Sequence, residues 1–155
     1  MMANSKDARH KQLLNMMNEL KDESDRAVAV LVGAFLDELL KDLIVATART
    51  DPDEIENLLF RNLGSFGSRI EGTHELKLLT QDECHDLRRV KEVRNIFAHE
   101  FVGVTFETPK VNELCQKLKT AKIGGQPPTA RECFTKSAVR LMVAIYTQSQ
   151  NKVSP

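Results

Sequence analysis

Apolar residues recur every three or four positions along most of the chain, which is the period of an amphipathic α-helix. The only segment with β character is 101–106, and because it contains Gly103 and has no obvious partner strand, we predict an extended loop there. The helical period predicts seven helices: 6–21, 25–48, 52–60, 69–79, 81–98, 108–120 and 129–149. Short connections favour antiparallel packing of consecutive helices. We therefore predict an all-α fold, a helical bundle of six to seven helices with no sheet of consequence.

Residues that begin helices stand where this pattern requires them. Ser24 precedes 25–48, and Asp51, Thr80 and Thr129 each precede a helix with a Glu three residues later, which is the capping-box pattern. No repeat, low-complexity tract or change of composition separates the helices. We therefore predict one domain over 1–155, with 1–23 as an N-terminal helix or arm and 24–150 as the bundle core.

The segment 25–48 has the most apolar pattern in the chain. Its first half, from Ala27 to Leu36, is apolar almost all round, whereas its second half is amphipathic. An all-round apolar pattern is typical of a helix buried at the centre of a domain. We therefore predict that this helix is central and that its first half is buried.

Composition excludes several classes of protein. Lys plus Arg and Asp plus Glu each number 22, and this balance disfavours a chain built mainly to neutralise phosphates, although a local basic face is not excluded. The three cysteines form no CxxC pair, which predicts reduced thiols and no metal site, and no motif indicates a cofactor. Because no apolar run approaches the roughly 20 residues of a membrane span and no secretory signal is present, we expect a cytoplasmic protein that does not enter a membrane.

The densest group of chemically active residues is RNIFAH, at 94–99. Arg94 would hold a phosphodiester, Asn95 would orient a hydroxyl or phosphate oxygen, and His99 would move a proton. Arg94 and His99 lie about 140° apart around an ideal helix, so both reach one ligand only if the arginine side chain bends toward the helix end. The alternative is structural: Arg94 pairs with a nearby carboxylate, and the helix dipole favours a histidine at this end.

A second group of candidates lies one turn earlier. The helix 81–98, preceded by 69–79, is the nearest match to a helix-turn-helix, and it carries Arg88, Arg89 and Lys91 as candidate nucleic-acid-binding residues. Acidic residues in its first turn would be repelled by phosphate. The alternative is a solvated helix face, in which Arg88 pairs with an acidic residue one turn away.

The pattern Arg-polar-x-x-x-His near the end of a helix resembles the motif of HEPN domains, with Arg94, Asn95 and His99 at its positions. Many HEPN proteins are metal-independent ribonucleases in which two protomers bring Arg and His together across a dimer interface. The resemblance implies an endoribonuclease or an RNA-binding module. Arg94 would then bind phosphate, and His99 would act as general acid and base.

A longer resemblance spans 25–118, in order and with close spacing. Its segments are DRAVAVLVGAFLDELLKDLI (25–44), LFRNLGSFGSRIEGTHELKLLTQDECHDLRRVKEVRNIFAHE (59–100) and F-x-x-P (106–109). Together they resemble the bacterial mannitol operon repressor family. The resemblance implies an all-helical regulator that lowers expression of mannitol uptake and utilisation genes.

These observations lead to one functional prediction and one alternative. With no clear helix-turn-helix and no excess of positive charge, we predict a transcriptional regulator that acts through protein contacts, either with itself as a homodimer or with a partner. We predict no catalytic step. The alternative is the HEPN-type ribonuclease or RNA-binding module.

Overall fold

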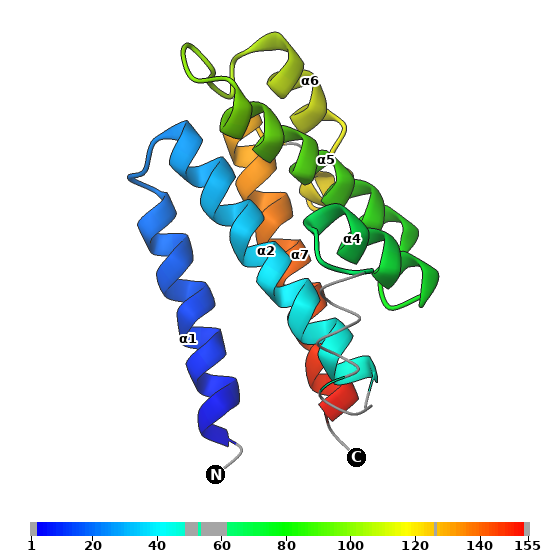
Figure 1. The fold of residues 1–155 in the computed structure, drawn as a ribbon. Helices are drawn as coiled ribbons and strands as arrows, with labels where there is room; N and C mark the ends of the chain where they lie inside the picture. Colours follow the sequence, from blue (N-terminus) through cyan, green and yellow to red (C-terminus); the bar gives the residue numbers. More distant parts are fainter. Residues whose placement is uncertain (1–2, 49–52, 54–61, 126, 154–155) are drawn as a thin grey trace.

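The structure is a computed structural model that describes residues 3–48, 53, 62–125 and 127–153. Its elements are α1 (Ala3–Leu20), α2 (Asp25–Ala48), α4 (Phe66–Glu75), α5 (Gln81–His99), α6 (Pro109–Gln116), the 3₁₀ helix η1 (Thr120–Lys122) and α7 (Ala130–Val153). No strand occurs in these ranges, and the predicted all-α bundle is confirmed (Figure 1). The helix predicted over 52–60 lies outside the described residues, apart from Asp53.

Three of the predicted helix starts are formed by the expected caps. The Ser24 hydroxyl accepts a hydrogen bond from the backbone N–H of residue 27 at 3.1 Å. Thr80 and Glu83 form a complete capping box at the start of α5. The Thr129 hydroxyl accepts from the backbone N–H of residue 132 at 3.1 Å. These helix starts depend on residues close in sequence, so the pattern located them correctly.

The central helix of the bundle is α2. It packs against α4, α5 and α7, and α2 and α7 lie side by side and run in the same direction (Figure 1). The core also includes Phe106, whose ring centroid lies 5.2 Å from those of both Phe97 and Phe134. One face of α2 is buried and comprises Val28, Ala29, Val32, Leu36, Leu39, Leu40 and Leu43.

The opposite face of α2 differs from the prediction. Val30 is 38% exposed and Leu31 is 46% exposed, although the all-round apolar pattern predicted burial. The contacts with α4, α5 and α7 bury the other face, and the α1 residues that join the core are Leu13 and Leu20. Within one chain, α2 is therefore central but partly open to solvent in its first half.

The observed limits of α4 lie several residues before the predicted limits of 69–79. Ser65 caps its start, because the Ser65 hydroxyl accepts from the backbone N–H of residue 68. A Schellman motif ends it, in which the Leu78 N–H donates to the Thr73 carbonyl at 3.0 Å. This motif requires a left-handed residue, and Lys77 supplies it with a φ of 55°.

We expect Lys77→Gly to raise the free energy of unfolding by about 0.5–1 kcal/mol, because glycine adopts a positive φ without a steric penalty from Cβ. The Lys77 side chain is exposed, so its removal costs no packing. Urea unfolding followed by circular dichroism measures the change. Lys77→Ala is the control and should bring no gain. An equal gain from alanine would show that the lysine side chain, and not the backbone conformation, is responsible.

The helix predicted over 108–120 ends early, at Gln116, and is followed by a turn and η1. The cause is Asp86 of α5, whose carboxylate accepts from the backbone N–H groups of Lys119 at 2.9 Å and Thr120 at 2.8 Å. In a continued helix, these N–H groups would donate to carbonyls one turn earlier. A side chain more than 30 residues away therefore ends this helix.

Candidate functional site

Arg94 packs into the junction of α2, α4 and α5. Its side-chain stem lies across Gly33, where a Cβ atom would come within 2.6 Å of Arg94 Cγ. Its guanidinium carbon lies 5.5 Å from the ring centroid of Phe66, within the range of a cation–π contact. Arg94 Nε is buried without a hydrogen-bond partner among the described residues. The observed contacts of Arg94 are thus packing contacts inside the fold.

The other two residues of the predicted site lie nearer the end of α5. Asn95 is half-buried and His99 is exposed. The carbonyl of Phe97 accepts from the Arg26 guanidinium, which ties this end of α5 to α2. In the described part of the chain, no hydrogen bond or ion pair joins Arg94 to His99. Their shared role in catalysis stays a prediction.

Two basic residues of α5, Arg88 and Arg89, are paired with acidic ones. Arg88 donates two hydrogen bonds to Glu71 of α4, at 2.7 and 3.0 Å. The guanidinium lowers the pKa of Glu71, and the carboxylate raises the pKa of Arg88. Arg89 pairs with Glu92 at 2.8 Å. Lys91 lies beside α4, near Gly67. The expected pairing of Arg88 within its own helix is wrong, because α4 offers a closer carboxylate.

These pairs also bear on the predicted helix-turn-helix. The second helix of that pair, α5, contributes one whole face to the core, including Leu87, Val90, Val93 and Phe97. The Arg88–Glu71 pair fastens α4 along it. A recognition helix must project from the domain to enter a groove of DNA. In the described residues, α5 is instead an internal helix of the bundle.

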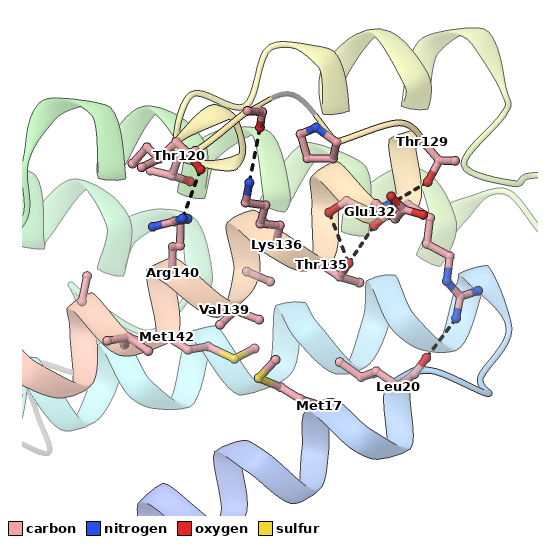
Figure 2. A pocket seen from close by; sticks show the side chains of 18 of the residues that line it. Met17, Leu20, Thr120, Thr129, Glu132, Thr135, Lys136, Val139, Arg140 and Met142 are labelled. Atoms are coloured by element: carbon pink, nitrogen blue, oxygen red, sulfur yellow. Dashed lines mark hydrogen bonds between the residues drawn. The ribbon is translucent and has the colours of Figure 1, made fainter.

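A concave surface lies between α1 and α7, and the sequence analysis did not predict it. This α1–α7 groove has a volume of about 1360 Å³. Met17 and Leu20 line it from α1 and Val139 lines it from α7 (Figure 2). Val143 of α7 and residues 123–125 and 127–129 complete the lining. The groove combines apolar side chains with charged ones, among them Lys21, Glu83, Arg131, Glu132, Lys136 and Arg140.

Two cations of α7 hold the loop that closes this groove. Lys136 donates to the carbonyl of Gly125 at 3.3 Å, and Arg140 donates to the carbonyl of Ile123 at 3.1 Å (Figure 2). The loop turns through Gly124 and Gly125, which have φ values of 86° and 121°. Such values favour glycine, so the two glycines shape this wall of the groove.

Asp86 binds residues 119 and 120, which precede this loop. Its side chain is fully buried, and besides two backbone N–H groups it accepts from the Thr120 hydroxyl at 2.6 Å. The Thr120 hydroxyl in turn lies 2.7 Å from the Ser137 hydroxyl on α7. The sequence carried one signal for this role: Asp86 is in helical register with Val90, Val93 and Phe97, so it falls on the buried stripe of its helix.

An ion pair lies beside the groove at the start of α7, next to the segment 127–129. Arg131 donates to Asp25 at 2.7 Å and to the carbonyls of Leu20 at 2.9 Å and Glu23 at 2.7 Å. Asp25 also accepts from the backbone N–H of Phe106 at 2.9 Å. Arg131 therefore joins the start of α7 to the end of α1 and the turn that follows it, and its charge is balanced by a carboxylate.

The cysteines do not form a reactive site. Cys84, Cys115 and Cys133 are free thiols and all are buried. Burial raises the pKa of each thiol above its usual value, that of Cys115 to about 12, so each stays protonated near neutral pH. No cluster of three or more metal-binding side chains occurs in the part of the chain that the structure describes. Over the same ranges, no helix has the length and apolar character to cross a membrane.

Comparisons with known proteins give one match. No family model matches the chain, and no curated protein does either. Among solved structures, the chain is similar to MtlR in the X-ray structure of the MtlR–HPr complex from Escherichia coli, with a TM-score of 0.71. The match covers 90% of this chain and 99% of that chain, at 15% sequence identity. The chain therefore has an MtlR-like, all-α fold.

Proposed function

We propose that this chain is a transcriptional regulator of the mannitol operon repressor kind, which acts by binding a partner protein and carries out no catalytic step. The observation that supports the proposal is the fold, which matches MtlR, solved in complex with a second protein, HPr, over nearly the full length of both chains. The sequence resemblance over 25–118 points to the same family. The proposed partner is the HPr protein of the same cell.

Charge and packing favour a protein partner over direct reading of DNA. The formal net charge is zero. Arg88 and Arg89 already pair with Glu71 and Glu92, and the helix that carries them is packed inside the bundle. DNA binding depends strongly on cations that are free to replace counterions at phosphates. Repression through protein contacts requires no such surface.

Calorimetric titration with purified HPr tests the proposal. We expect saturable binding with a Kd of roughly 1–100 µM, the range of transient regulatory contacts. A gel shift with the operator region at two salt concentrations is run in parallel. No heat of binding to HPr, together with a salt-resistant and sequence-specific DNA shift, would contradict the proposal. Sedimentation velocity of the free chain tests the predicted homodimer separately.

The absence of a catalytic step has its own test. We expect no cleavage of single-stranded RNA in EDTA, because the Arg94 stem and guanidinium are engaged by Gly33 and Phe66 while His99 lies exposed near the end of the helix. His99→Ala is the matched control, and its RNA profile should be the same as that of the wild type. Cleavage by the wild type that His99→Ala abolishes would establish the HEPN-type alternative.

A further inference from the structure

The floor of the α1–α7 groove is apolar, and Met142 at its base is buried. Met17 lines the groove from α1 and Val139 from α7, and Ile123 and Val143 at its edges are 55% and 53% exposed. Exposed apolar side chains gathered in a concavity mark binding surfaces more strongly than scattered ones. Methionine side chains adapt their shape, and such grooves bind the apolar face of an amphipathic helix.

The charged side chains that line the groove include more cations than carboxylates. Lys136 and Arg140 stand one turn apart on α7, and among the described residues they donate to backbone carbonyls of the closing loop and form no ion pair. Lys21, in the turn that follows α1, adds a third cation, and Glu83 and Glu132 are the carboxylates that line the groove. Arg131 differs, because Asp25 balances its charge. Carbonyl partners leave the net charge in place, so the groove attracts negatively charged groups.

The length of the groove suits one short helix. Its α7 side runs from about 129 to 143, which is about 21 Å at 1.5 Å per residue. A helix of about 14 residues spans that length and places apolar side chains at i, i+3, i+4 and i+7 over the floor. Acidic side chains along its flank would face Lys136 and Arg140.

We infer that the α1–α7 groove is the docking site for an acidic amphipathic helix of a partner protein, with the apolar face on Met17, Val139 and Val143 and the acidic flank on Lys136 and Arg140. This inference rests on the proposed function, and it adds the surface used and the chemistry that the partner must present. The partner's carboxylates would compete with the loop carbonyls for the two cations. Docking would therefore also act on the loop 123–125.

Two synthetic 15-residue helical peptides test the inference by fluorescence anisotropy. Both carry leucine at i, i+3, i+4, i+7 and i+11, and one has glutamates along the flank where the other has lysines. We expect the glutamate peptide to bind at least tenfold more tightly, with a smaller difference in high salt. Val143→Glu should weaken its binding about tenfold. Val45→Glu on α2, outside the groove and 39% exposed, is the matched control that should leave binding unchanged.

A charge-reversal experiment distinguishes a change in peptide recognition from a loss of protein stability. The double variant Lys136→Glu with Arg140→Glu should prefer the lysine peptide, whereas Lys110→Glu on α6 should keep the wild-type preference. Equal affinity for both peptides in the wild type, or full binding by Val143→Glu, would overturn the inference. HPr binding is read separately. If HPr fails to bind while the glutamate peptide binds, the proposed partner is wrong and the groove assignment stands. If HPr binds equally to wild type and Val143→Glu and neither peptide binds, the groove assignment alone is wrong.

Discussion

Asp86→Ala is expected to lower the free energy of unfolding by about 3–5 kcal/mol, because it removes the acceptor for several buried donors at once. The backbone N–H groups of Lys119 and Thr120 and the Thr120 hydroxyl all donate to this carboxylate. Without it, these groups stay buried and unpaired. Urea unfolding measures the loss. The glutamate peptide should also bind less tightly, because Asp86 positions the loop that closes the groove.

Asp82 provides the control for this prediction. It lies one turn before Asp86 on α5 and pairs with Lys119 at 3.2 Å, but its side chain is 62% exposed. Asp82→Ala should therefore change stability by less than about 0.5 kcal/mol. Asp86→Asn keeps one acceptor oxygen and should fall between the two alanine variants. Equal losses from Asp82→Ala and Asp86→Ala would show that the buried network does not stabilise the fold.

The sequence predicted the helices well where their limits depend on neighbouring residues. The limits of α2 agree with the prediction, and Thr80 begins α5 as expected, because a cap and the apolar period both act within a few residues. The end of α6 could not be predicted in this way. It depends on Asp86, which is distant in sequence and whose role appears only when α5 and the loop before α7 come together.

In the candidate site, too, features that depend on neighbouring residues were predictable and features that depend on distant residues were not. The predicted site consisted of residues close in sequence, Arg94, Asn95 and His99. The direction of the Arg94 side chain is instead set by Gly33 and Phe66 on two other helices. The α1–α7 groove as a whole could not be predicted, because its two sides are more than 100 residues apart in the chain. A surface of this kind becomes visible only once the packing is known.

Gly33→Ala is expected to lower the free energy of unfolding by about 1–2 kcal/mol, although alanine is the better helix former by about 1 kcal/mol. The reason is steric: the new methyl group would lie 2.6 Å from Arg94 Cγ. That atom belongs to the inner stem of the side chain, so the whole arginine must move. Its guanidinium would then leave Phe66. Urea unfolding measures the loss.

A double-mutant cycle with Arg94→Ala isolates this contact. Arg94→Ala removes Cγ and leaves the Cβ of residue 94 as the nearest atom, 3.3 Å from the methyl group at residue 33. Gly33→Ala should then be between neutral and stabilising by about 1 kcal/mol through helix propensity. The coupling energy between the two positions should therefore be about 1–3 kcal/mol. Additive effects would mean that Arg94 does not lie across Gly33. The side chain would then be free to turn toward His99, as the RNIFAH motif first suggested.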